Sequence, residues 1–191
     1  MDADVDEASL AALGRARTLT TGCGGASASG RIETPTGCLR INTTTSFDPR
    51  AILAACADLQ HRSELYRRTG CVHAAALALP DGRLLDFAED VGRHNAVDKV
   101  IGACWLAGHD LGQCFLVTTG RLSSEIAAKT ISAKIPMLVS RGAPTSAAVR
   151  LAERFLLTLV GFVRGGRMNV YAYPERIAGL SLVPPLGGCT P

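Results

Sequence analysis

The sequence predicts an α/β fold with three layers, in which helices cover both faces of a mixed β-sheet. Helical and strand-like patterns alternate between residues 48 and 173. Two strand-like segments are continuous apolar runs, which is typical of parallel strands buried on both faces. A hairpin pattern precedes these runs and adds antiparallel strands to the sheet. The predicted order is α-β-β-α-β-α-β-α-β-β.

The first predicted element is a helix between Asp48 and Gly70. Asp48 suits the N-cap, Pro49 suits the first helical position, and Gly70 ends the pattern. Apolar residues recur at helical spacing along it: Ile52, Leu53, Cys56 and Leu59. Residues 71–90 then predict two strands joined by a Pro-Asp-Gly turn at 80–82.

Strands and helices alternate through the rest of the chain. The predicted helices are 95–110, 123–134 (capped by Ser123 or Ser124) and 145–157; the predicted strands are 113–120, 135–145 and a pair within 158–173 around Gly165 and Gly166. The helix at 95–110 has one apolar face, formed by Val97, Val100, Ile101, Cys104 and Trp105.

Composition shifts divide the chain into four regions. They are an N-terminal arm (1–17), a cysteine-bearing loop region (18–47), the α/β core (48–177) and an irregular C-terminal tail (178–191). The second region is rich in Thr, Gly and Ser, and such long irregular stretches are usually functional or disordered.

The bulk composition limits the classes of partner. The 191 residues are 47% hydrophobic with a formal charge of +3, which fits a globular domain with an anionic small ligand and gives little reason to expect nucleic acid. The sequence shows no signal-peptide pattern, and no apolar run reaches the ~18 residues of a membrane span. The seven cysteines form no C-x-x-C pair or disulfide framework, so we expect a reducing cytoplasm.

Four predicted turns combine glycine with arginine: "EDVGRHN", "TTGRLSSE", "SRGAPTS" and "GFVRGGR". Ligands of such sheets bind beyond the C-terminal ends of parallel strands, where helix N-termini favour anions. Arginine adds bidentate contacts to phosphate or carboxylate. The turns therefore predict a polyanionic ligand, with ordinary solvated turns as the alternative. The arginines concerned are Arg93, Arg121, Arg141, Arg164 and Arg167.

Histidine and cysteine supply the other candidates. His94 and Asn95 begin a helix at the mouth of the predicted sheet and are candidate site residues, whereas His73 is more typical of a core histidine and His61 and His109 of surface positions. Cys56, Cys104 and Cys114 lie in apolar stretches, which is typical of core residues, and Cys189 has no expected role.

Cys23 is flanked by glycines in "TTGCGGAS". Such a setting exposes the sulfur and surrounds it with backbone N–H groups that lower a thiol pKa, which suits a nucleophile or a sulfur carrier. The alternative is a free cysteine without a role. Cys38 and Cys71 also lie beside glycines and are rival candidates.

Five long motifs resemble the FdhD family of formate dehydrogenase accessory proteins across residues 18–177. They are "TGCVHAAAL", "EDVGRHNAVDKVIG", "TTGRLSSEIAAK", "IPMLVSRGAPTSAAVRLAE" and "LTLVGFVRGGRMNVYAYPERI". The resemblance implies a cytidine-deaminase-like core and a homodimer. It also implies a sulfurtransferase that takes persulfide sulfur from a cysteine desulfurase. The sulfur then passes to the molybdenum of bis(molybdopterin guanine dinucleotide), which serves formate dehydrogenase.

The resemblance assigns the persulfide to Cys23. It places the cofactor's guanine nucleotide against Phe162, Val163, Arg164, Gly165, Gly166 and Arg167. The turns predicted to bind the same ligand add Arg93, His94, Asn95, Gly120, Arg121, Ser140 and Arg141. We expect no zinc, no nucleic acid and no membrane partner.

Two departures from the family pattern bear on the mechanism. Many members carry C-x-x-C in the cysteine loop, whereas Ala26 stands three residues after Cys23 here. Members also usually carry an additional N-terminal region, so we expect a truncated or short member. A non-catalytic chaperone for the molybdenum cofactor is the main alternative. A zinc-dependent deaminase is less favoured, because Ala75 follows His73 where its H-x-E motif needs glutamate and no P-C-x-x-C motif follows Pro136.

Overall fold

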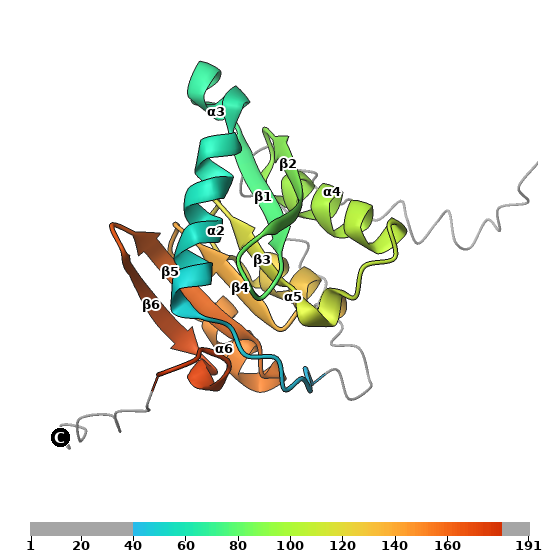
Figure 1. Cartoon of the computed structure of the whole chain (residues 1–191), viewed down its shortest axis with the longest axis vertical. Coiled ribbons are helices and arrows are strands. Elements are labelled where there is room, and N and C mark those ends of the chain that lie inside the picture. The colour runs from blue at the N-terminus through green and yellow to red at the C-terminus, as the bar shows by residue number, and fades with distance from the viewer. Residues whose placement is uncertain (1–39, 181–191) are drawn as a thin grey trace, which may run out of the picture. The chain divides into compact units, whose positions relative to one another are not determined.

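The computed structural model describes residues 40–180 (Figure 1). Its helices are α2 (Pro49–Arg62), α3 (Glu64–Thr69), α4 (Arg93–Leu106), α5 (Ser124–Ser132) and α6 (Ser146–Phe155), with short 3-10 turns η1 (Leu111–Gln113) and η2 (Pro174–Arg176). Its strands are β1 (His73–Ala78), β2 (Leu84–Asp90), β3 (Phe115–Thr118), β4 (Met137–Ser140), β5 (Thr158–Arg164) and β6 (Arg167–Ala172). The predicted arm, Cys23, Cys38 and Cys189 lie outside the described residues.

The six strands form one mixed sheet in the order β2-β1-β3-β4-β5-β6. The central strands β3, β4 and β5 are parallel, while β1 is antiparallel to both β2 and β3, and β6 is antiparallel to β5. The predicted α/β class and the mixed sheet are therefore confirmed.

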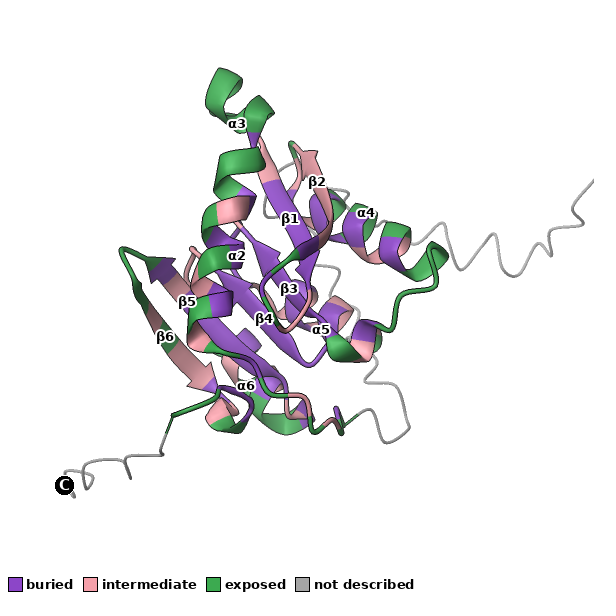
Figure 2. Ribbon diagram, viewed as in Figure 1, coloured by how far each residue is buried: buried purple, intermediate pink, exposed green. Residues whose placement is uncertain are grey.

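Alternate residues of the strands face opposite sides of the sheet, as the period-2 geometry of a strand requires. Ala75, Leu77 and Leu116 face a core shared with α4, α5 and α6. Ala76, Phe115 and Val117 face a second core against α2. Figure 1 shows α2 on one face and the other long helices on the opposite face, and Figure 2 shows the central strands buried throughout. These two cores make the three predicted layers.

Capping residues begin several helices where the sequence predicts. Asp48 accepts a hydrogen bond from the Arg50 amide at 2.7 Å, with Pro49 at the first helical position. Of the two serines proposed to cap α5, Ser123 is the cap, accepting from the Ile126 amide at 3.4 Å. Each cap satisfies a backbone N–H that has no partner within its own helix.

Two features differ from the predictions. The single helix expected between Asp48 and Gly70 is broken at Ser63, whose hydroxyl donates to the Leu59 carbonyl at 2.7 Å. Trp105, expected on the buried face of α4, is 69% exposed. Cys104 faces the sheet, and the next residue lies about 100° further round a helix.

Other sequence predictions concern single side chains. Cys56, Cys104 and Cys114 are buried, as expected of core residues, and burial raises the pKa of Cys56 to about 12. His61 and His109 are exposed, and His73 is half-buried. Within residues 40–180, no helix is both long and apolar enough to cross a membrane.

Candidate functional site

The predicted Arg/Gly turns meet at one edge of the sheet. The parallel strands β3 and β4 both end there, and β1 begins there because Ala75 pairs antiparallel with Thr118. The end of β2 lies at the same edge, since Asp90 pairs with His73. We call this edge, with the turns that follow β2, β3 and β4, the site edge. In open α/β sheets this position is where ligands bind.

Hydrogen bonds join the loop after β3 to the loop after β4. The Leu122 amide donates to the Ala143 carbonyl at 3.0 Å, and the Thr145 amide donates to the Leu122 carbonyl at 2.9 Å. The buried Ser140 hydroxyl donates to the Gly120 carbonyl at 2.5 Å and accepts from the Gly142 amide at 2.8 Å. These bonds fix the two loops, and with them the starts of α5 and α6, relative to each other.

Three glycines allow the turns of the site edge to pack against one another. A Cβ on Gly120 would lie 2.9 Å from Arg93 Cβ, and a Cβ on Gly142 would lie 2.8 Å from the Gly120 carbonyl oxygen. A Cβ on Gly161 would lie 3.2 Å from the Gly142 carbonyl oxygen. Each turn therefore touches the next without space for a side chain. Sequence reasoning missed Gly161, although a glycine within an apolar strand signals a close approach of this kind.

The hairpin of β5 and β6 adjoins the site edge through Phe162. The Phe162 amide donates to the Gly142 carbonyl at 3.2 Å, and Phe162 itself has a φ of +54°, which is unusual for a residue with a side chain. The Arg164 guanidinium lies 5.6 Å from the centre of the Phe162 ring. Arg164 and Arg167 are exposed, whereas Val163 is buried in the core against α2.

Gly165 and Gly166 form the tip of this hairpin, with φ values of +58° and +72°. Glycine adopts this left-handed conformation without the strain that a side chain adds. A Cβ at either position would meet no described atom within 4 Å, so the tip presents open backbone between two arginines.

The first turn of α4 is tied to the end of β2. Asp90 Oδ1 accepts from the Gly92 amide at 2.8 Å and from Asn95 Nδ2 at 3.1 Å, while Lys99 Nζ lies 2.6 Å from Asp90 Oδ2. The hydrogen bond from Lys99, followed by the one from Gly92, lowers the pKa of Asp90 to about 2. Asn95, a predicted ligand contact, therefore makes a hydrogen bond within the protein.

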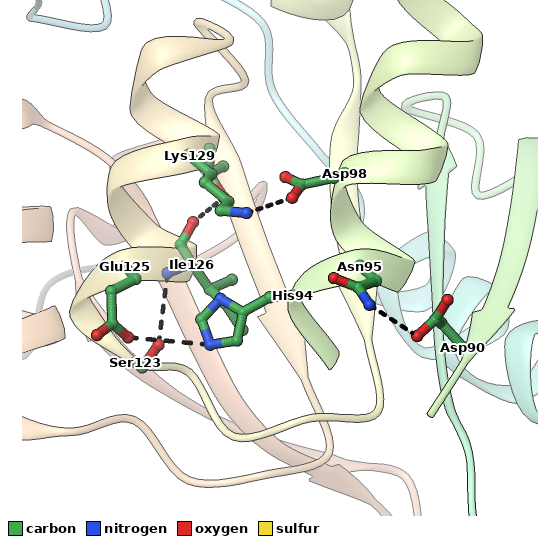
Figure 3. A network of polar contacts seen from close by, with 9 residues as sticks. Asp90, His94, Asn95, Asp98, Ser123, Glu125, Ile126 and Lys129 are labelled. Atoms are coloured by element: carbon green, nitrogen blue, oxygen red, sulfur yellow. Dashed lines mark hydrogen bonds and ion pairs between the residues drawn. The ribbon is translucent and has the colours of Figure 1, made fainter. Parts of the chain in front are cut away.

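Two polar side-chain contacts connect α4 to α5 (Figure 3). His94 Nε2 lies 3.9 Å from Glu125 Oε2, and one turn further along both helices Lys129 is paired with Asp98. Desolvation, together with the charges of Arg93 and Lys129, lowers the pKa of His94, although Glu125 and Asp98 act in the opposite direction. Glu125 is a residue of this network that sequence reasoning missed.

His73 lies at the site edge among positive charges. Desolvation lowers its pKa first, and the charges of Arg93 and Arg121 lower it further. Both histidines of the site edge, His73 and His94, therefore favour the neutral imidazole, which accepts hydrogen bonds or protons.

The predicted residues divide into two groups in the structure. The turns after β2, β3 and β4 hold Arg93, His94, Gly120, Arg121, Ser140 and Arg141 together at the site edge, next to Phe162. His73, which the sequence assigned to the core, begins β1 at the same edge. Arg164 to Arg167 lie on the adjoining hairpin. Cys71 is exposed two residues before His73, and its thiol donates to the Thr69 carbonyl at 3.2 Å.

Two cavities of about 380 and 530 Å³ lie at the opposite edge of the sheet. Both are lined by Ile41, Asn42, Thr43 and Gln113, and neither contains a predicted site residue. Residues 40–180 contain no group of three or more His, Cys, Asp or Glu side chains placed to hold a metal ion.

Known proteins share both the sequence and the fold. Residues 1–178 match the FdhD/NarQ family. The chain is 37% identical over 177 residues to the sulfur carrier protein FdhD of Wolinella succinogenes, covering 93% of this chain and 61% of that protein. It is 49% identical over 129 residues to the sulfur carrier protein FdhD of Streptomyces avermitilis, covering 66% and 46%.

A solved structure is also similar. It is a crystal structure from Desulfotalea psychrophila, described as that of a formate dehydrogenase accessory protein, with a TM-score of 0.66 and 40% identity. The match covers 70% of this chain and 59% of that one. The chain thus spans 61% and 46% of the length of the two curated relatives named above.

Proposed function

The chain belongs to the FdhD/NarQ family, and on that premise we propose that it is a sulfur carrier that serves formate dehydrogenase. In this proposal it takes persulfide sulfur from a cysteine desulfurase. It then passes the sulfur to the molybdenum of bis(molybdopterin guanine dinucleotide), which is its substrate. The observation that carries the proposal is the meeting of the separate Arg/Gly turns at one sheet edge.

The site edge suits the phosphates of such a dinucleotide. Arg121 and Arg141 follow adjacent parallel strands, and Arg164 and Arg167 lie on the neighbouring hairpin. Guanidinium groups bind phosphate through two parallel hydrogen bonds, and the N-termini of α5 and α6 add partial positive charge. The open backbone of Gly165 and Gly166 lets a flat guanine or a phosphate approach closely.

Cys23 is the proposed carrier, as its glycine-rich setting predicts. In the loading step the Cys23 thiolate attacks the outer sulfur of the donor's persulfide, and the donor cysteine leaves as a thiolate. The outer sulfur now forms a persulfide on Cys23, and no external oxidant or reductant is consumed. A lowered thiol pKa favours this step because the thiolate is the nucleophile.

Release of the sulfur as a sulfide needs a second thiol. That thiol attacks the Cys23 sulfur, forms a disulfide with it and releases hydrosulfide, which becomes a ligand of the metal. Since Ala26 replaces the second cysteine of the C-x-x-C pattern, the attacking thiol comes from elsewhere. Cys38 and Cys71 are the alternatives, and Cys71 is an exposed free thiol beside the site edge.

The proposal is tested by peptide mass spectrometry after incubation with a cysteine desulfurase and L-cysteine. We expect one added sulfur on Cys23 in the wild type and in Cys71→Ala, and none in Cys23→Ala. Added sulfur on Cys38 or Cys71 would move the carrier site and keep the function. No added sulfur on any cysteine, with guanine nucleotide still bound, would favour the chaperone alternative.

The remaining family expectations are part of the same proposal. They are a cytoplasmic location, a homodimer and the absence of zinc. Size-exclusion chromatography with light scattering tests the dimer, and elemental analysis of the purified protein tests the absence of stoichiometric zinc.

A further inference from the structure

A bulge interrupts the pairing of β5 with β6. Gly161 pairs with Asn169 and Arg164 pairs with Arg167, so three steps along β5 match two steps along β6. The extra residue falls at Phe162, whose φ of +54° is unusual for a bulky side chain. Bulges and strained backbone of this kind are concentrated beside binding sites, where they re-aim a side chain.

The bulge turns Phe162 away from the core that its neighbours fill. Val160 and Val163 both pack in the core against α2. The Phe162 ring instead lies 6.5 Å from the ring of Tyr171, which packs against the opposite core. In a regular strand Phe162 would share a face with Val160, so the bulge is what brings the two rings together.

Gly161 makes room for the Tyr171 ring and connects it to the site edge. A Cβ on Gly161 would lie 3.1 Å from Tyr171 Cε2. It would also lie 3.1 Å from Cδ of Pro144, which belongs to the turn after β4. The two aromatic rings therefore sit directly against a turn of the site edge. Figure 2 shows β6 only partly buried along its length.

Polar groups accompany the two rings. The Arg164 guanidinium lies 5.6 Å from the centre of the Phe162 ring. Asn169 is exposed on β6, and its Nδ2 donates to Tyr171 Oη at 3.4 Å. The Asn169 carbonyl oxygen accepts no hydrogen bond from residues 40–180, so it is available to a ligand. We call Phe162, Arg164, Asn169 and Tyr171 the aromatic patch.

We propose that the aromatic patch binds the purine base of the nucleotide, and that Asn169 and Tyr171 of β6 select guanine over adenine. The inference rests on the proposed function, because it takes the nucleotide end of the cofactor as the ligand. Aromatic rings and guanidinium planes both stack on nucleobases. The patch continues into the hairpin tip, so a stacked base leaves the phosphates beside Gly165, Gly166 and Arg167.

The selectivity follows from the orientation of the Asn169 side chain. A carboxamide offers both donors and an acceptor, so it distinguishes two bases only when its orientation is fixed. Here Nδ2 is directed to the Tyr171 hydroxyl, which leaves the carbonyl oxygen as the acceptor for a ligand. Guanine presents two adjacent donors, N1–H and the 2-amino group, whereas the same positions of adenine carry none.

The test is titration calorimetry of the full chain with GDP, ADP and inorganic pyrophosphate. Tyr171→Leu removes the ring, Asn169→Ala removes the carboxamide, and Asn169→Asp keeps an acceptor at that position. Tyr66→Leu on α3 and Asn42→Ala before α2 are matched controls, because both residues are exposed and lie outside the hairpin.

We expect the wild type to bind GDP more tightly than either ADP or pyrophosphate. Tyr171→Leu should weaken GDP binding at least about fivefold, because one stacking ring is lost, and should leave pyrophosphate binding within about twofold. Asn169→Ala should lower the ratio of GDP affinity to ADP affinity at least about threefold. Asn169→Asp should keep that ratio at the wild-type value or above, and both controls should bind all three ligands as the wild type does.

The Asn169 variants keep the test decisive even if Tyr171→Leu is unstable, because Asn169 is exposed whereas Tyr171 is partly buried. Urea unfolding followed by circular dichroism shows which variants are folded. An equal loss of GDP and pyrophosphate binding in a folded Tyr171→Leu would refute the inference, because the substitution would then act on the phosphate contacts. Equal wild-type affinity for GDP and pyrophosphate would also refute it, since the base would add nothing to binding.

The failure of the inference is distinguishable from the failure of the proposed function. If Tyr171→Leu and Asn169→Ala bind GDP and ADP as the wild type does while Arg164→Ala/Arg167→Ala binds GDP more weakly, the aromatic patch is not the base site and the proposed function stands. If the wild type binds none of the three ligands, the inference fails together with the proposed cofactor site.

Discussion

Replacing Gly142 by alanine tests whether close packing of the turns creates the site edge. The new Cβ would lie 2.8 Å from the Gly120 carbonyl oxygen and 3.1 Å from Arg121 Cα. Both contacts are to backbone, so no flexible side chain can move aside. The loop that carries Arg121 must shift, and the hydrogen bond from the Ser140 hydroxyl to Gly120 must lengthen.

The expected cost follows from two opposing effects. Inserting a methyl group into a well-packed site destabilises a protein by about 1–3 kcal/mol. Replacing glycine restricts the unfolded chain and returns about 0.4–1 kcal/mol. We therefore expect Gly142→Ala to lower the free energy of unfolding by about 1–2 kcal/mol. Urea unfolding followed by circular dichroism measures this change.

The same substitution should weaken binding of GDP, used as a probe for the guanine end of the cofactor, because it displaces Arg121. Gly102→Ala is the control: a Cβ there meets nothing within 4 Å, and the residue lies inside α4. It should stabilise the protein by up to about 1 kcal/mol and leave GDP binding unchanged. If Gly142→Ala keeps wild-type stability and GDP affinity, the packing of these turns does not position the site.

Three further predictions concern other parts of the described chain. Arg164→Ala/Arg167→Ala should weaken GDP binding in calorimetry at least tenfold with little change in the unfolding midpoint, and unchanged affinity would remove the hairpin from the site. Arg176 is buried, donates to the Ile41 carbonyl at 2.7 Å and to the Leu156 carbonyl, and lies 4.3 Å from the centre of the Tyr173 ring. Arg176→Leu should therefore lower the free energy of unfolding, measured in urea, by about 2–5 kcal/mol. A loss below about 1 kcal/mol would show that these buried contacts do not stabilise the fold. Folding lowers the pKa of His73 and of His94 below the usual value of 6.5. Just below pH 6.5 the unfolded chain therefore binds more protons than the folded chain does. The free energy of unfolding should be at its full value above that pH and fall as the pH drops below it. His73→Gln/His94→Gln should make this decline shallower, and an identical pH dependence of urea unfolding would show that other groups cause it.

The sequence predicts the fold well because its signals are local. Apolar periodicity, Asp48 with Pro49, and the Pro-Asp-Gly turn at 80–82 each depend on a few neighbouring residues. The break at Ser63 has no such signal. It accompanies the anchoring of α3 by Glu89, which lies far along the chain. The exposure of Trp105 likewise depends on which side of α4 packs against the core, and that side carries Cys104.

The site was predictable to the level of turns and less so to the level of side chains. Strand topology alone brings Gly120, Arg121, Arg141 and Gly142 together. Sequence cannot show that the Ser140 hydroxyl bridges two loops or that Val163 packs against α2, because both facts depend on register and on close approach across the sheet. The ligand contacts proposed for these residues remain predictions.

Delivery of sulfur is the most direct test of the central claim, that this chain carries sulfur to a molybdenum cofactor held at its site edge. Purified chain is loaded with radiolabelled sulfur by a cysteine desulfurase, separated from it and mixed with bis(molybdopterin guanine dinucleotide) and a thiol. We predict that label from the wild-type chain appears on the cofactor, and that Arg164→Ala/Arg167→Ala loads normally but transfers little label to the cofactor, because the thiol releases it as free hydrosulfide. Equal labelling of the cofactor by both proteins, or no labelling of the cofactor by the wild type, would contradict the account.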